Sequence, residues 1–272
     1  MTAYRTSCVI LLASFTIATT AQAQTASPPP PPSRSQVVEI GVESQDYDNG
    51  YGSLRSVKLE YRLDMGDTTV TFSTAGGERR TNGTSSRALQ FGGAIYHDLS
   101  PSFSTRTAAY IAEDDPVFAR YDLAQDFTVR LADKTTATIG GRWAQYFGGR
   151  DVYFLSGGLR RYFRGGSIAY RATYVIAEGQ KDSLSQLINL SINDASGRGK
   201  TLLWLNAGAA TFDGARIDTG FSPKDFGGLV QRIQPLNRDF SLSLSAGMQS
   251  YARPAGRVTG TKLGMGLVFS VE

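Results

Sequence analysis

The chain has 272 residues and a net charge of +4, and its 28 basic and 24 acidic residues are spread along its length. Nucleic-acid-binding domains gather basic residues into one stripe, and no such cluster occurs here. The chain has one cysteine and one histidine. It therefore cannot form an internal disulfide or a thiolate metal centre of several cysteines, and it has few groups for histidine-based catalysis. The composition therefore argues against a nucleic-acid partner, a disulfide framework and a metalloenzyme.

Residues 1–23 are predicted to be a signal peptide. Met1–Arg5 carries positive charge, Cys8–Ala18 is an apolar run too short to span a bilayer, and Ala21–Ala23 is a small-x-small cleavage site. Cleavage is expected before Gln24. Because Cys8 lies in the removed segment, the mature chain is expected to have no thiol.

Residues 24–35 are predicted to form a proline-rich periplasmic arm. The run "PPPPP" (Pro28–Pro32) favours an extended polyproline conformation without a folded core. Two interpretations stay open for it, a plain spacer and a docking segment for a partner domain.

Residues 36–272 repeat one pattern, an alternating segment followed by a break rich in Gly, Asp, Asn or Pro. About fourteen such segments are expected, with twelve as the alternative count. They lie at 36–45, 53–64, 67–77, 86–98, 102–113, 118–130, 134–146, 151–163, 166–178, 183–193, 200–211, 223–235, 239–251 and 257–271. No stretch after the signal peptide is apolar for the roughly 20 residues that a membrane helix needs.

Each segment has one apolar and one polar face. In "VKLEYRL" (Val57–Leu63) every second residue is apolar and those between are charged. A soluble β-sandwich shows the same alternation, but its strands centre on about five or six residues, whereas tilted membrane-spanning strands need about nine to eleven. The length of these segments therefore predicts an all-β fold, a transmembrane up-and-down antiparallel β-barrel.

The breaks between segments alternate in length, as expected for a barrel whose two termini lie in the periplasm. Tight turns such as "ADK" (Ala132–Lys134) and "RGG" (Arg164–Gly166) alternate with longer loops such as "ERRTNGTSS" (Glu78–Ser86). Aromatic residues near the segment ends are expected to form interfacial girdles. They are Tyr47, Tyr51, Tyr146, Phe147, Phe163, Phe212, Phe221 and Tyr251.

Two hairpins have a distinctive sequence, "YDNGYGSLRSVKLEYRL" (Tyr47–Leu63) and "DVYFLSGGLRRYFRGGSIAYRATY" (Asp151–Tyr174). They resemble hairpins of the YaiO family of outer-membrane β-barrel proteins, and the remaining segments are similar to it only as a general barrel pattern. The resemblance implies an integral barrel in the outer membrane of a Gram-negative bacterium. It implies no particular biochemical activity.

The polar face is expected to line the lumen and to carry more basic than acidic residues. The lumen-lining candidates are Lys58, Glu60, Arg62, Arg106, Arg120, Asp122, Asp126, Arg130, Arg142, Arg160 and Arg171, with Arg232 and Lys262 placed on the same face by alternation. If the lumen is open, the excess positive charge favours passage of small anionic or saccharide-like solutes. If it is closed, the same residues form ion pairs in a structural or partner-docking barrel.

An enzyme is not predicted. His97 and Asp98 are adjacent on a strand, so their side chains point to opposite faces and do not form a triad with Ser100. Carboxylates in "AEDDP" (Ala112–Pro116) and "DYD" (Asp46–Asp48) are expected to be solvated loop charges, with divalent-cation binding as the alternative.

No cofactor is expected, and no nucleic acid. The expected partners are outer-membrane lipid, lipopolysaccharide and the outer-membrane assembly machinery, which recognises a long last strand such as "KLGMGLVFSV".

Overall fold

A computed structural model of the chain describes residues 35–81, 83–178, 182–196, 199–208, 225–253 and 256–271. The predicted signal peptide, and the predicted arm up to residue 34, lie outside the described residues. In the described ranges, no helix is long and apolar enough to cross a bilayer.

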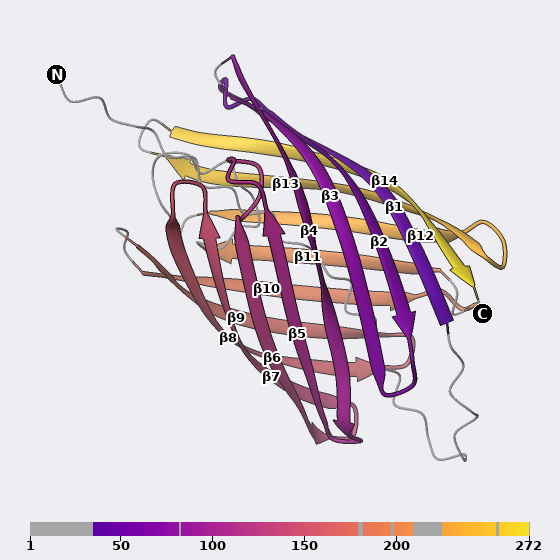
Figure 1. Cartoon of the computed structure of the whole chain (residues 1–272). Coiled ribbons are helices and arrows are strands. Elements are labelled where there is room, and N and C mark those ends of the chain that lie inside the picture. The colour runs from indigo at the N-terminus through magenta and orange to yellow at the C-terminus, as the bar shows by residue number, and fades with distance from the viewer. Residues whose placement is uncertain are drawn as a thin grey trace.

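Fourteen antiparallel strands form one closed barrel (Figure 1). The first seven are β1 (Ser35–Tyr47), β2 (Ser53–Asp64), β3 (Thr68–Thr81), β4 (Thr84–Ser100), β5 (Phe103–Ala112), β6 (Tyr121–Ala132) and β7 (Thr135–Tyr146). The others are β8 (Arg150–Phe163), β9 (Gly166–Ala177), β10 (Ser183–Asn193), β11 (Lys200–Gly208), β12 (Phe226–Pro235), β13 (Phe240–Arg253) and β14 (Gly256–Val271).

The barrel is closed because its first and last strands pair along their lengths. Each strand pairs with its neighbours in sequence, and β1 pairs with β14 from Gln36 opposite Val271 to Tyr47 opposite Gly260. Closure satisfies the backbone groups of every strand, which is what a lipid environment requires. The prediction of a fourteen-stranded transmembrane barrel is thereby confirmed over its twelve-stranded alternative.

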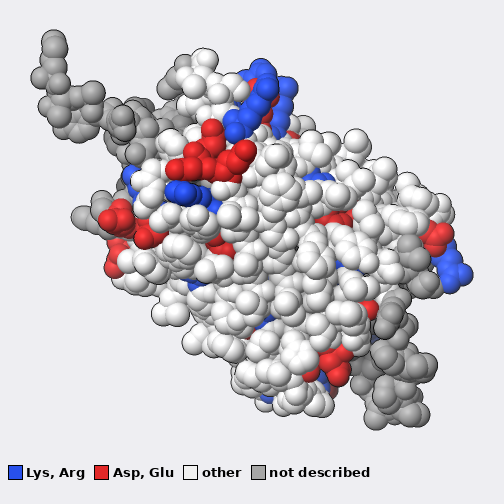
Figure 2. Space-filling model, in the orientation of Figure 1, with Lys and Arg blue, Asp and Glu red and all other residues white. Residues whose placement is uncertain are grey.

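The outer face carries large exposed apolar side chains on every strand. Examples are Phe72 on β3, Ile139 on β7 and Leu263 on β14, which are 59%, 61% and 59% exposed. In a soluble protein so many exposed apolar groups would have no partner, whereas a barrel turns them toward lipid. Figure 2 shows the result on one face, a broad uncharged band with charged side chains gathered toward its two ends.

The two ends of the barrel differ. Strands β2 and β3 are joined by a tight turn in which Met65 N–H donates to Thr68 O at 2.7 Å, and short turns also join β6 to β7 and β8 to β9. The barrel begins and ends, at Ser35 and Val271, on this same side. Outer-membrane barrels have short periplasmic turns and longer extracellular loops, so this end is assigned to the periplasm.

One strand begins later than predicted. The alternating pattern placed a segment at 118–130, but β6 begins at Tyr121. Residues 113–120 form instead a loop whose Val117 and Phe118 are fully buried. An apolar side chain in a loop mimics the alternation of a strand, and the loop occupies the extracellular mouth.

Candidate functional site: the lumen and its two mouths

The charged side chains of the strands point into the lumen. Arg171 on β9 reaches Asp126 on β6 at 2.5 Å (Nη2 to Oδ1), although β7 and β8 separate these strands. Two side chains meet across two intervening strands only on the inner face. On β2, the alternation places Lys58 on this inner face between the exposed Val57 and Leu59.

An ion-pair network covers the inner wall from β5 to β9. The carboxylate of Asp126 accepts from Arg171 and, at 3.4 Å, from Arg106 Nη1. Arg106 Nε also donates to the Tyr96 hydroxyl at 3.1 Å, and Arg171 Nη2 donates to Ser156 Oγ at 2.6 Å. Shared acceptors of this kind couple the wall strands, and the single carboxylate balances the charge of one of the two guanidinium groups.

A second pair lies on β6 and β7. Arg142 donates from Nε to Asp122 Oδ1 at 2.7 Å and from Nη2 to Oδ2 at 2.5 Å. Its guanidinium also lies 4.8 Å from the ring centroid of Phe154. Two parallel bonds plus a ring contact fix both charges in one geometry. This pair therefore has a structural role in the wall and adds little free charge to the lumen.

The opposite wall lines a small polar cavity of about 150 Å³. Four of its five charged side chains are paired, Lys58 with Glu60 at 2.6 Å and Lys262 with Glu43 at 2.7 Å, and the fifth is Glu39. The remaining lining is rich in hydroxyl and amide groups, with two aromatic rings: Ser56, Ser73, Gln90, Phe118, Trp204, Gln231, Ser243 and Ser245. Hydrogen-bonding groups beside rings suit a polar, hydroxyl-rich solute.

Positive charge gathers at the periplasmic end of the lumen. Lys200, the first residue of β11, has Arg160 and Arg62 as its charged neighbours. Arg62 is bound to Asp64 at 2.6 Å, whereas Arg160 donates to the hydroxyl of Ser167 at 3.2 Å. In the described part of the chain, no carboxylate pairs with Arg160 or Lys200. This mouth therefore carries positive charge that is not neutralised locally.

Two clusters of buried apolar side chains lie at the extracellular end of the lumen. On one side Val117 and Phe118 pack with inward residues of β1, β2, β4, β13 and β14, and on the other Ala119 packs with inward residues of β7, β8 and β9. We call residues 113–120 the roof loop. Because it contacts inner walls on both sides, it crosses the extracellular mouth, and Phe118 is also part of the lining of the cavity below.

Three of the predicted girdle aromatics belong to this filling. Tyr47, Tyr146 and Tyr251 lie inside the barrel mouth, 8%, 1% and 1% exposed. The prediction of an interfacial position was wrong for them, because proximity to a strand end does not fix the face on which a ring lies. Phe163 is exposed on the outer face, in keeping with a girdle position, and Phe212 and Phe221 lie outside the described residues.

The packing of the roof loop is expected to depend on pH through Asp115. Burial, and then the neighbouring carboxylates Glu113 and Asp114, raise the pKa of Asp115 above its ordinary value of 3.8. A raised pKa means that the packed loop favours the protonated carboxyl, so packing strengthens as the pH falls and weakens as it rises through the raised pKa. Amide hydrogen exchange at residues 117–119, corrected for intrinsic rates, should show more protection at acidic pH. Asp115→Asn should remove this dependence, and equal protection of the unmodified chain at all pH values would contradict it.

Most of the predicted lumen-lining residues lie on the inner face of the barrel. The structure places Arg106, Asp122, Asp126, Arg142 and Arg171 in the ion-pair network of one wall, Lys58, Glu60 and Lys262 at the cavity, and Arg62, Arg130 and Arg160 toward the periplasmic end.

Two predicted residues lie elsewhere. Arg120 precedes β6 in the roof loop, where its guanidinium lies 5.2 Å from the Tyr121 ring centroid and 3.5 Å from Asp114. Arg232 is on the outer face of β12, two residues from the exposed Val230, and pairs with Asp194 at 2.6 Å. Both positions were predicted by extending the alternation of a strand. Arg120 lies before the start of β6, where the alternation does not apply, and on β12 the inward and outward positions were interchanged.

Residues considered for catalysis or metal binding are placed in structural contacts. His97 Nδ1 is 2.8 Å from Thr68 Oγ1 on the next strand, and Ser100 Oγ is 3.3 Å from Ser102 Oγ. Among the described residues, no three of His, Cys, Asp and Glu gather as metal ligands. The acidic segment Ala112–Pro116 is part of the roof loop.

Sequence reasoning missed several groups at the lumen. Lys200, Glu39 and Glu43 are inward by the same alternation that identified the others, so the signal was present at the segments 36–45 and 200–211. Arg79 was also missed; it is 1% exposed and its guanidinium lies 5.6 Å from the Tyr47 ring centroid. No pattern in the sequence marks Phe118 as a roof residue.

Comparison with known proteins agrees with this architecture. Among solved structures, the chain is similar to the "CymD monoaromatic hydrocarbon channel", with a TM-score of 0.61 at 6% identity, covering 88% of each chain. It also relates it to the "TodX deltaS2S3 mutant monoaromatic hydrocarbon channel", with a TM-score of 0.57 at 9% identity, covering 89% of this chain and 91% of that one. A "Bacterial polysaccharide outer membrane secretin" matches with a TM-score of 0.56 at 7% identity, over 87% of this chain and 98% of the other.

At such low identities these TM-scores show the fold alone, which is that of outer-membrane barrels of the porin and channel type. Residues 35–225 match the family described as "YaiO membrane beta barrel domain", which is more than half of the chain. This chain belongs to the YaiO family of bacterial outer-membrane β-barrels.

Proposed function

We propose that this barrel is a narrow passive channel that favours small anionic or saccharide-like solutes. The proposal is carried by the positive charge of Arg160 and Lys200 at the periplasmic mouth, which no carboxylate of the described residues neutralises. A fixed positive charge beside a narrow aqueous opening lowers the energy of an entering anion and raises that of a cation.

The polar cavity supports the second part of the proposal. Its hydroxyl and amide groups lie beside Trp204 and Phe118, and four of its five charged groups are paired with one another. Such a lining offers hydrogen bonds and ring surfaces to a neutral, hydroxyl-rich solute.

Ion selectivity in a planar lipid bilayer tests the proposal. The mature chain is expected to give conductance steps with a reversal potential on the anion-selective side in a salt gradient. Arg160→Glu with Lys200→Glu should lower the anion-to-cation permeability ratio by roughly tenfold, because replacing two charges changes the ion's energy by one or more kcal/mol.

A matched control is Arg161→Glu. Arg161 lies next to Arg160 on β8 but faces outward, where it donates to Thr135 Oγ1 at 3.1 Å. Its replacement should leave the selectivity unchanged. Conductance with no charge preference, or an equal effect of both variants, would contradict the proposal.

A structural or partner-docking barrel with a closed lumen is the second candidate function, and the roof loop favours it. Val117 and Phe118 are buried across the extracellular mouth, and the Arg171–Asp126 pair lies on the inner wall below. Under this alternative, both the unmodified chain and a variant with an undocked roof loop would be silent in the bilayer.

A further inference from the structure

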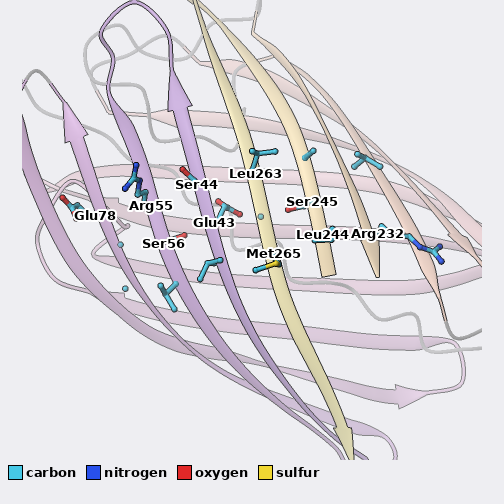
Figure 3. Close-up of a pocket in the computed structure, with 17 residues that line it drawn as sticks. Glu43, Ser44, Arg55, Ser56, Glu78, Arg232, Leu244, Ser245, Leu263 and Met265 are labelled. Carbon is cyan, nitrogen blue, oxygen red and sulfur yellow. The ribbon is translucent and has the colours of Figure 1, made fainter. Parts of the chain in front are cut away.

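A groove of about 980 Å³ crosses the outer wall of the barrel from β12 through β13, β14, β1 and β2 to β3 (Figure 3). One of its sides is a row of outward residues that the strand register aligns from strand to strand. This row consists of Val230, Ala246, Leu263, Ser44, Arg55 and Glu78. The register thus makes a continuous groove out of positions far apart in the sequence.

The second side is the next outward row, one pleat closer to the periplasm, and includes Met265, Val42 and Gly76. Between the two rows the side chains of Glu43 and its neighbours point into the lumen, so the floor of the groove is backbone. Gly76 deepens it, because it presents no side chain between its strand partners Val57 and Leu89. The groove is therefore apolar, narrow and open to the lipid side.

Three arginines surround its extracellular end. Arg55 lies in the groove, and Arg80 and Arg87 contact the Glu78 carboxylate at 2.8 Å and 3.4 Å. All four side chains lie on the outer face at the extracellular ends of β2, β3 and β4. In the described chain Arg55 has no polar partner, so the three arginines have one carboxylate among them, that of Glu78, which Arg80 and Arg87 contact. Basic side chains gather near the tips of these hairpins at the top of Figure 2.

The other end of the groove carries no such excess. Arg232 lies there, but both of its terminal nitrogens contact the Asp194 carboxylate, at 2.7 Å and 2.6 Å. Positive charge without a local counter-ion is therefore confined to the end that meets the headgroups of the outer leaflet. An apolar groove ending in guanidinium groups matches a lipid with an acyl chain and a phosphate.

We propose that this groove binds lipopolysaccharide through its lipid A, with an acyl chain along the groove and a phosphate at Arg55, Arg80 and Arg87. Outer-leaflet lipid A supplies both parts of this chemistry, acyl chains and phosphorylated headgroups. The site faces the membrane and is separate from the lumen, so it does not depend on whether the barrel conducts.

The test is binding of bisphosphorylated lipid A to the detergent-solubilised mature barrel, measured by native mass spectrometry. The unmodified barrel should retain lipid A more strongly than phosphatidylethanolamine. The variant Arg55→Gln, Arg80→Gln, Arg87→Gln should bind lipid A at least roughly tenfold more weakly. Gly76→Leu, which fills the groove without changing charge, should weaken binding to a similar extent.

The matched control is Arg161→Gln, an exposed outward arginine at the periplasmic end of β8. It should bind lipid A as the unmodified barrel does. The heat-dependent gel shift of folded barrels verifies that each variant is folded. Equal lipid A binding by the unmodified chain and the arginine variant, or equal retention of phosphatidylethanolamine and lipid A, would overturn the proposal.

Discussion

Replacing Arg142 by alanine is expected to lower the free energy of unfolding of the barrel by about 3–5 kcal/mol, as found when one partner of a buried ion pair is removed. Asp122 is 7% exposed and accepts two hydrogen bonds from Arg142. Without the guanidinium its charge remains inside the wall with no counter-ion. The contact with the Phe154 ring is lost as well. Urea unfolding in lipid vesicles, followed by tryptophan fluorescence, measures the change.

The cost comes from the unpaired charge, so removing both charges should restore most of the stability. Arg142→Met combined with Asp122→Leu keeps comparable volume and is expected to lie within about 1–2 kcal/mol of the unmodified barrel. Arg161→Ala on the exposed outer face should change stability by less than about 1 kcal/mol. If Arg142→Ala had an equally small effect, water would be hydrating Asp122 in place of the arginine.

The strands were predictable because their signal is local. In "VKLEYRL" the polarity of each residue indicates whether its side chain faces the lipid or the lumen. The predicted segment 53–64 coincides with β2, Ser53–Asp64. Fourteen such segments with alternating short and long breaks leave an up-and-down arrangement as the simplest connection. Closure then follows, since the edges of β1 and β14 that do not face β2 and β13 pair with each other.

The contacts inside the lumen were not predictable, because they depend on the register between strands. Alternation marks Arg142 and Arg160 as inward alike, yet one is held by a carboxylate through two bonds and the other by a serine hydroxyl. The contact between Arg171 and Asp126 spans two intervening strands, so it can be seen only once the positions of all four strands are known. A list of inward arginines therefore overstates the free charge of a pore, and only the register separates wall pairs from mouth charges.

The apolar filling of the extracellular mouth escaped the sequence for a related reason. The inner face was expected to be polar throughout. At the extracellular ends of the strands, however, lumen-facing residues such as Tyr146, Val152 and Val175 are apolar and pack against the roof loop. A loop that folds back into a barrel turns part of the lumen into a hydrophobic core. At the extracellular end the inner face therefore combines apolar side chains with buried polar ones such as Arg79 and Asp122.

Undocking the roof loop is expected to produce the largest change in conductance. Val117 and Phe118 are 0% and 1% exposed, and burial of each side chain contributes about 1.5–3 kcal/mol to docking. Val117→Ser with Phe118→Ser should therefore weaken docking by several kcal/mol and raise the open probability in a planar bilayer by more than about a hundredfold.

A reversible lock separates movement of this loop from damage to the fold. A Cβ added at Gly77 would lie 2.6 Å from Val117 Cγ1, close enough for Gly77→Cys and Val117→Cys to form a disulfide. The predicted mature chain has no other cysteine. The oxidised pair should hold the extracellular mouth shut, and a reductant should restore the conductance. Full conductance with the disulfide formed would show that solutes pass beside the roof loop. If the serine variant gave no conductance, the barrier would lie deeper in the lumen, at the ion pairs of the inner wall.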